Sequence, residues 1–217
     1  MTTDALLAAR QPTTFIESVA PEIVELAHML TRQTPRESAV ALFEWVRDQV
    51  RYEPRDVFLD RNGYRATAVL QRRSGYCVQK AVLLAALCRA ADIPARLGFV
   101  DVRNHKTPRW LLQLMGTDVF VFHGYVVLYL DGVWVKAAPT LDTESAQRAG
   151  ADVVELDGVH DAMLHPVDPT GQPYIEHVCD RGWHDDVPYG EIVAALHRAY
   201  PQIAERFETQ KATDFTG

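Results

Sequence analysis

The segment SGYCVQKAVLLAALCRAADIPAR, residues 74–96, constrains the fold more than any other part of the chain. From Val82 to Cys88 it is apolar at every position, so a helix here has no polar face. A helix that is apolar on all sides is buried at the centre of a protein. Gly75 and Pro94 mark the two ends of this helix. The longest apolar-rich run, Ala81–Leu87, is shorter than the roughly 20 residues that cross a bilayer. The other elements must therefore pack around one central helix.

The sequence before this segment predicts two further helices. Apolar residues recur at helical spacing after Pro21 and again after Pro35, and proline suits the first turn of a helix. The second of these helices ends before Pro54, because the residue before a proline avoids helical backbone angles. A last helix is predicted over Gly190–Tyr200, near the end of the chain.

The sequence after the central helix predicts strands. Residues 95–103 alternate loosely between apolar and polar. Two β-rich runs then flank Asp131-Gly132, and Asp-Gly between such runs indicates a two-residue hairpin turn. Residues 104–119 are predicted to form a long loop, and residues 143–190 are predicted to be rich in loops. Helices followed by an antiparallel sheet indicate an α+β fold.

Length and charge limit the class of protein. The 217 residues, 47% hydrophobic and 24% charged, fit one globular domain over 1–217. We expect a core at about 36–142 and a loop-rich C-terminal extension at 143–217. The formal charge is 22 − 29 = −7, with no run of Lys or Arg. We therefore expect no nucleic-acid partner and no membrane partner, and the oligomeric state stays open.

The cysteines and the N-terminal residues indicate a compartment. The chain has three cysteines, an odd number that cannot all pair within one chain. The first residues, MTTDALLAARQPTTF, include an acid and no long apolar stretch, unlike a secretory signal. We expect a soluble, reduced, cytoplasmic protein.

Cys77 is the candidate nucleophile, because it opens the central helix. Unpaired backbone N–H groups and the helix dipole at that end favour a thiolate over a thiol. The same N–H groups can bind the oxyanion of a tetrahedral intermediate. The alternative is a small apolar residue packed under the helix start, which is what most free cysteines are. Cys88, in the middle of the helix, is predicted to be a core residue.

His123 is the candidate base. It begins an apolar and aromatic strand, FHGYVVLYL, where an unpartnered histidine costs free energy. With a two-residue turn at Asp131-Gly132, paired positions across the hairpin sum to 263. His123 then faces Thr140, and Asp142 is one of its diagonal neighbours, within side-chain reach. Asp142 is therefore the candidate group that orients the imidazole.

Three pieces of the sequence, in this order, resemble the bacterial transglutaminase-like superfamily, the Cys-His-Asp proteins related to papain-like cysteine proteases. They are ALFEWVRDQVRYEP, GYCVQKAVLLAALCRAADIPAR and FHGYVVLYLDGVWVKAAPTLD. The resemblance implies a papain-like core of helices packed on an antiparallel β-sheet, with Cys77 as nucleophile at the N-terminus of the central helix. It also implies that His123 acts first as general base and then as general acid.

One position departs from the family pattern. The family commonly carries an aspartate before Pro-Thr, and here that position is Ala138. An alanine can neither orient an imidazole nor stabilise an imidazolium. Three outcomes follow: Asp142 takes over, the histidine lacks a carboxylate partner, or catalysis is lost.

The leading hypothesis is therefore a cysteine-dependent acyl-transfer enzyme that hydrolyses an amide or peptide-like bond through a thioester on Cys77. Its substrate would be a small molecule or peptide with an amide or ester carbonyl. The alternatives are an inactive transglutaminase-like binding protein and a small-molecule acyltransferase. The oxyanion site would use the Cys77 N–H and a second donor, for which Tyr64 and Gln71 are candidates.

Two other features are weaker. His160, His165, His177 and Cys179 lack the paired spacings of a structural zinc site, so no metal and no cofactor is expected. The segment 104–119 is long for a connecting loop. It is either an active-site lid that brings Arg109 and Trp110 to the substrate or a packed surface loop.

Overall fold

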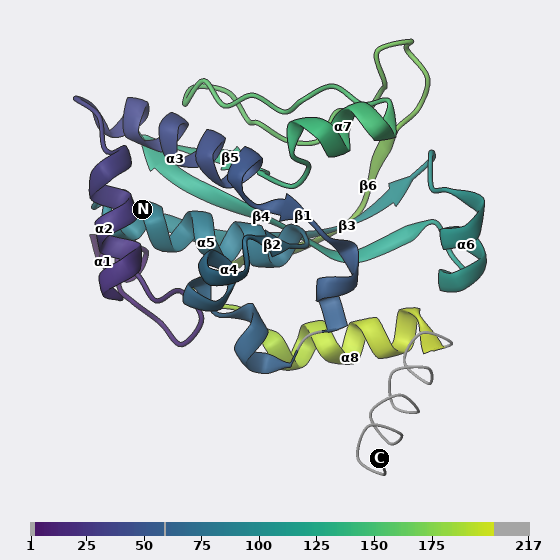
Figure 1. The fold of residues 1–217 in the computed structure, drawn as a ribbon, viewed down its shortest axis with the longest axis horizontal. Helices are drawn as coiled ribbons and strands as arrows, with labels where there is room; N and C mark the ends of the chain where they lie inside the picture. Colours follow the sequence, from purple (N-terminus) through teal and green to yellow (C-terminus); the bar gives the residue numbers. More distant parts are fainter. Residues whose placement is uncertain (1–2, 59, 202–217) are drawn as a thin grey trace.

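The computed structural model describes residues 3–58 and 60–201, and it confirms the α+β fold with an antiparallel sheet (Figure 1). Helices before the sheet are α1 (Thr3–Ala8), α2 (Pro21–Leu30), α3 (Pro35–Gln49), α4 (Ala66–Arg72) and α5 (Cys77–Ala90), with 3-10 helices η1 (Pro54–Phe58) and η2 (Arg61–Tyr64). Two short strands, β1 (Arg51–Tyr52) and β2 (Ser74–Gly75), pair in parallel. The main sheet holds β3 (Ala95–Asn104), β4 (Val119–Leu130), β5 (Val133–Ala137) and β6 (Ile175–His184). Three helices lie between or after these strands: α6 (Arg109–Met115), α7 (Thr143–Ala149) and α8 (Tyr189–Ala199).

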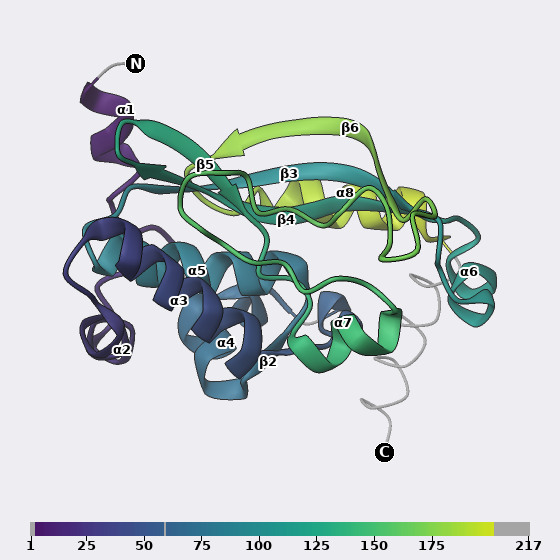
Figure 2. The same cartoon turned by 90° about the horizontal axis from the view of Figure 1, so that it is seen from above.

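Helix α5 is the central helix that the sequence predicts. Every residue from Val78 to Cys88 is fully buried. On one side α5 packs on β4 and β3, and on its other sides it contacts α2, α3 and α4 (Figure 2). The polar residues near its ends are buried with partners. The ammonium group of Lys80 donates to the carbonyls of Arg47 and Val50 at 2.9 and 2.6 Å, at the end of α3.

The hairpin has the predicted register. The five pairs run from Leu130↔Val133 to Val126↔Ala137, so each pair sums to 263. Asp131 and Gly132 both have positive φ, at 48° and 91°, as the two central residues of a type I′ turn require. The sheet order is β5-β4-β3-β6, with every neighbouring pair antiparallel.

The prediction of loops over 104–119 and 143–190 is wrong in three places. Helix α6 forms within the first segment and ends at Gly116, which has a φ of 72°. Helix α7 begins the second segment, and β6 later joins the sheet beside β3. Strand β6 is an edge strand whose residues 176–180 are exposed, so its sequence carries no alternation of apolar and polar residues. Its pairing with β3 is interrupted twice by register shifts.

None of the helices within the described residues is long and apolar enough to cross a membrane. The predicted last helix is present as α8, and any continuation beyond Pro201 lies outside the described residues.

Candidate functional site

Cys77 is the first residue of α5, and the backbone before it is fixed by a side-chain hydrogen bond and by a strand pairing. The N–H of Tyr76, the residue before the helix, donates to the Gln79 side chain at 3.1 Å. Strand β2 leads into the helix and pairs with β1, which follows α3, so that Tyr52 pairs with Gly75. This parallel pair places Tyr52 close to the start of α5.

The histidine strand contacts the helix at the same point. The N–H of Gly124 donates to the Cys77 sulfur at 3.5 Å. A Cβ at Gly124 would lie 2.8 Å from the Cα of Val78, so only glycine allows this approach of strand to helix. His123 is the neighbour of Gly124, and its side chain and that of Cys77 line one cavity. The structure therefore brings the candidate nucleophile and the candidate base to a shared cleft.

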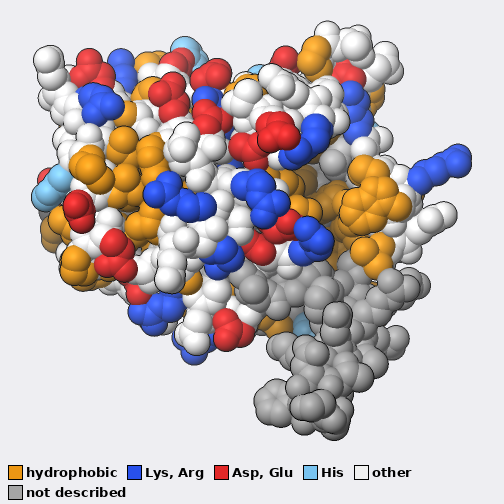
Figure 3. All heavy atoms as spheres, viewed as in Figure 1, with side chains coloured by type: hydrophobic (Ala, Val, Ile, Leu, Met, Phe, Trp, Pro, Cys, Tyr) orange, Lys and Arg blue, Asp and Glu red, His pale blue; other side chains and the backbone are white. Residues whose placement is uncertain are grey.

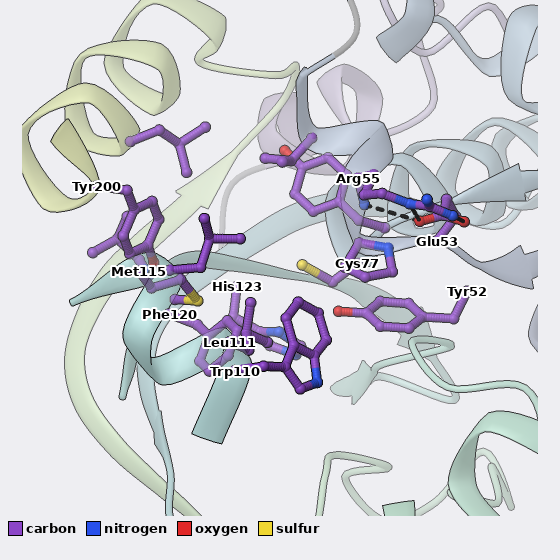
Figure 4. A pocket seen from close by; sticks show the side chains of 16 residues that line it. Tyr52, Glu53, Arg55, Cys77, Trp110, Leu111, Met115, Phe120, His123 and Tyr200 are labelled. Carbon is purple, nitrogen blue, oxygen red and sulfur yellow. Dashed lines mark hydrogen bonds and ion pairs between the residues drawn. The ribbon is translucent and has the colours of Figure 1, made fainter. Parts of the chain in front are cut away.

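The cavity has a volume of about 480 Å³ (Figure 4). Figure 4 shows the Cys77 sulfur and the Tyr52 hydroxyl directed into the same space, with Leu111, Trp110 and Met115 across from them. The lining residues come from the segment after α3, from the start of α5, and from α6, β4 and α8: Tyr52, Glu53, Pro54, Arg55, Val57, Tyr76, Cys77, Trp110, Leu111, Leu114, Met115, Phe120, Val121, His123, Leu196 and Tyr200.

Burial sets the ionisation of both candidate catalytic groups. Cys77 is 7% exposed, and burial raises its pKa to about 11, although N–H groups of Gly124, Val78 and Cys77 itself work in the opposite direction. Burial also lowers the pKa of His123 to about 4. Desolvation of Cys77 therefore works against the thiolate that the helix N-terminus favours. The resting pair at neutral pH is a thiol beside a neutral imidazole.

The structure does not place Asp142 on the His123 ring. Its carboxylate accepts hydrogen bonds from the Tyr52 N–H at 2.8 Å and from the Ser145 N–H and hydroxyl at 2.8 and 2.9 Å. Asp142 thus caps the N-terminus of α7 and holds β1. Burial by itself raises the pKa of Asp142, but these hydrogen bonds outweigh it and keep the pKa below its ordinary value. The Nε2 atom of His123 is buried and has no hydrogen-bond partner among the described residues.

The two sequence candidates for a second oxyanion donor do not line the cavity. The Tyr64 hydroxyl donates to the carbonyl of Val57 at 2.7 Å, and its side chain is 1% exposed. Gln71 is also absent from the cavity wall.

Tyr52 lines the cavity, and the sequence did not predict it as a site residue. The sequence feature that could have indicated Tyr52 is its position in RYEP, where the chain leaves α3 just before a proline. Burial raises the pKa of Tyr52, so its hydroxyl keeps the proton that it can donate.

The segment 104–119 contributes to the cavity through α6. Trp110 lies in the wall, 63% exposed, whereas Arg109 is not a lining residue.

Among the described residues, the histidines and the cysteine of the C-terminal part do not gather into a metal site. His160 pairs with Asp157 at 2.7 Å, and Cys179 is exposed. Within the part of the chain that the structure describes, no three His, Cys, Asp or Glu side chains are grouped to hold a metal ion.

Several solved structures are similar to this chain at low identity. A candidate cysteine protease from Cytophaga hutchinsonii has 18% identity and a TM-score of 0.49, with 85% of this chain and 55% of that chain covered. A candidate protease from Parabacteroides distasonis has 17% identity and a TM-score of 0.42, with 62% and 26% covered. A protein named TGase has 18% identity and a TM-score of 0.39, with 67% and 35% covered. The alignment thus spans little more than half of the first of these proteins.

No curated protein matches the chain. The sequence profile of the transglutaminase-like superfamily matches residues 24–139, which is more than half of the 217 residues. The match includes α3, the whole of α5 and the hairpin with His123. It therefore covers the first two pieces on which the resemblance rests and the third as far as Pro139, and this chain belongs to the transglutaminase-like superfamily.

Proposed function

We propose that this protein is a cysteine-dependent hydrolase that cleaves an amide or ester bond through a thioester on Cys77. One observation carries the proposal. Cys77, at the N-terminus of α5, and His123, on β4, line the same cavity, and the residue after His123 donates a hydrogen bond to the Cys77 sulfur. A nucleophile, a base and a space for a substrate thus converge at one place.

The first half-reaction starts from the neutral pair. The Cys77 sulfur attacks the substrate carbonyl carbon while a ring nitrogen of His123 takes the thiol proton. Because the thiol pKa is about 11 and the imidazole pKa about 4, the proton moves together with the attack rather than before it. The tetrahedral intermediate then collapses to a thioester, and the leaving amine or alcohol takes the proton from His123.

The second half-reaction regenerates the enzyme. Water attacks the thioester carbonyl, His123 takes a proton from that water, and the acid product leaves as the proton returns to the sulfur. In both halves the oxyanion needs donors. We assign these to the N–H groups at the start of α5 and to the Tyr52 hydroxyl, which Figure 4 shows directed into the cavity beside Cys77.

Asp142 has a different role in this proposal from the one that the sequence suggests. By accepting the Tyr52 N–H at 2.8 Å it fixes the strand that carries the hydroxyl donor. It is a positioning residue that acts through Tyr52. Asp142→Asn should then lower kcat and leave the pKa of His123, followed by NMR, unchanged. A shift in that pKa would instead support the orienting role.

A second candidate function is a binding protein that keeps the cavity without turnover. Two observations favour it: position 138 holds a buried alanine, and the Nε2 atom of His123 has no hydrogen-bond partner among the described residues. A small-molecule acyltransferase is the proposed reaction with an amine or alcohol, in place of water, resolving the thioester.

The test is trapping of the thioester. The protein is mixed with p-nitrophenyl butyrate, quenched in acid and examined by mass spectrometry. A butyryl adduct on Cys77 and steady release of nitrophenolate are expected, and both should vanish in Cys77→Ala. Cys179→Ser, which changes an exposed thiol, is the matched control and should behave as the wild type. Release that survives Cys77→Ala would contradict the proposal, and no adduct or release in the wild type would favour the binding protein.

A further inference from the structure

The cavity beside Cys77 has two ends of different chemistry. Cys77, His123 and Tyr52 supply polar atoms at one end. The rest of the wall is built almost wholly of apolar side chains from α6, β4 and α8: Trp110, Leu111, Leu114, Met115, Phe120, Val121 and Leu196, with Tyr200 beside them. A substrate carbonyl placed at the sulfur therefore has an apolar compartment next to it.

Among the described residues that line it, the wall offers no unpaired charge. Its charged residues are Glu53 and Arg55, which pair with each other at 2.8 and 2.9 Å. The hydrogen bond from Arg55 lowers the pKa of Glu53 to about 2, so the carboxylate stays charged and paired. The Arg55 side chain is 83% exposed, so this pair lies at the rim. A charged chain inside the cavity would lose its hydration without gaining a partner.

The polar atoms of Tyr200 are also occupied. Its hydroxyl accepts from the Val121 N–H and donates to the Val119 carbonyl, both at 2.9 Å. This aromatic side chain thus presents its ring, rather than a free hydroxyl, to a ligand. It also fastens the C-terminal end of α8 to β4 and closes one side of the compartment.

The compartment opens to solvent beside α6. Trp110 of this helix lines the compartment and is 63% exposed. In Figure 3 hydrophobic side chains gather next to the place that α6 occupies in Figure 1, with Lys and Arg side chains beside them. An apolar chain can therefore enter from the surface, over Trp110.

We propose that this compartment binds the acyl group of the substrate, and that the preferred acyl group is an uncharged, apolar alkyl chain of medium length. This deepens the proposed function and rests on it. The acyl group stays bonded to the Cys77 sulfur through both half-reactions, whereas the leaving group departs after the first. The part of the cavity that holds a group throughout is thus the part that selects it. The chemistry is unchanged: the carbonyl carbon–sulfur bond forms as the bond to the leaving oxygen or nitrogen breaks, and water restores the thiol.

The test varies the acyl chain with the leaving group held constant. The p-nitrophenyl esters of acetate, butyrate, octanoate and palmitate are compared by kcat/KM. Each buried methylene should raise kcat/KM by about fourfold until the chain fills the compartment. We expect octanoate to be the best of the four and palmitate to fall below it.

Two variants of α6 provide a matched pair. Leu114→Asp places a carboxylate in the wall and should reduce the octanoate rate by more than tenfold while changing the acetate rate little. Leu112→Asp makes the same change on the exposed face of the same helix, away from the wall, and should leave both rates near those of the wild type. Thermal melts confirm that both variants fold.

A binding experiment tests this inference independently of the proposed hydrolase activity. Cys77→Ala is titrated calorimetrically with octanamide, with acetamide, and with an octanamide that carries a terminal ammonium group. Octanamide alone should bind. Turnover that depends on Cys77 but is fastest with acetate would overturn the inference and leave the hydrolase intact. If no ester is turned over, the proposed hydrolase activity is wrong, and the binding experiment then decides the inference. Selective binding of octanamide would support an apolar acyl-binding compartment. Equal or absent binding of the three amides would overturn it.

Discussion

The Nε2 atom of His123 and the hydroxyl of Thr140 are both buried, and among the buried side-chain nitrogen and oxygen atoms of the described residues these are the two without a hydrogen-bond partner. The register that pairs Val126 with Ala137 brings position 140 opposite position 123 when it is extended along the chain. Beyond the last pair of that register, Ala138 packs in one buried cluster with Tyr125, its counterpart in the extended register. A ring N–H and a hydroxyl are complementary, and each costs free energy when buried alone.

Thr140 should accordingly matter for catalysis. We expect Thr140→Val to lower kcat by about tenfold, because the hydroxyl that can hold the imidazole is lost. Thr140→Ser keeps the hydroxyl and should restore most of the rate. The measurement is the pH profile of kcat together with the NMR shift of the His123 ring. Equal kcat and equal profiles for the Val and Ser variants would show that Thr140 only packs.

Ala138→Asp should strengthen the site. The new carboxylate would lie at the position where the resemblance places the family's aspartate, and it should raise the pKa of His123 from about 4 and increase kcat by at least about tenfold. Ala138 is 1% exposed, so the variant should also lose about 1–3 kcal/mol of stability. Ala138→Asn, of equal size but uncharged, should share the instability and not the gain. A gain in both variants would argue against a charge effect.

Gly124→Ala should disturb the close contact between strand β4 and the start of helix α5. Its Cβ would meet the backbone of Val78 at 2.8 Å, so β4 or α5 must shift and the hydrogen bond to the Cys77 sulfur is strained. We expect a loss of about 1–3 kcal/mol in urea unfolding and a larger proportional loss of activity. Gly190→Ala, in α8 with no atom near the added Cβ, is the control and should be neutral or slightly stabilising. A fully active Gly124→Ala protein would mean that the close approach is not required.

Lys80 should make stability depend on pH. Burial lowers its pKa to about 7, from about 10.4 in an unfolded chain. Between these values the unfolded chain holds a proton that the folded chain has released, so this residue makes the free energy of unfolding rise with pH from about 7 to about 10. The buried thiols of Cys77 and Cys88, whose pKa values burial raises, work in the opposite direction above about pH 8.5. The difference between wild type and Lys80→Met isolates the lysine.

Urea melts of both proteins at several pH values measure that difference. Lys80→Met also removes two hydrogen bonds to the end of α3, so this variant should be less stable than the wild type above pH 10. The difference in the free energy of unfolding between the two proteins should become smaller as the pH falls toward 7. A gap that stays constant over this range would contradict the lowered pKa.

Thiol labelling should rank the three cysteines by exposure. At pH 7 without substrate, iodoacetamide should modify exposed Cys179 first, Cys77 slowly and Cys88 least. Because burial raises the pKa of Cys77 to about 11, its rate should keep rising as the pH approaches that value. Peptide mapping by mass spectrometry gives the three rates. Cys77 labelled ahead of Cys179 at pH 7 would show a stabilised thiolate and would restore the expectation from the helix N-terminus.

The sequence by itself determined the central helix, the hairpin and its register. Residues 82–88 are apolar on every side, and Asp131-Gly132 permits a turn with two positive φ values, so both features follow from local properties of the chain. The start of α5 and the apolar strand FHGYVVLYL were enough to nominate Cys77 and His123, which line one cavity in the structure.

Tertiary structure alone decided the rest. Asp142 lies within diagonal reach of position 123 by arithmetic, yet its carboxylate is taken by Tyr52 and Ser145. The direction of the Cys77 pKa follows from how completely other segments exclude water. The cavity wall joins α6 and α8, residues far apart in the chain. Desolvation and competition among hydrogen-bond partners depend on which distant residues meet, and no local pattern of residues encodes that.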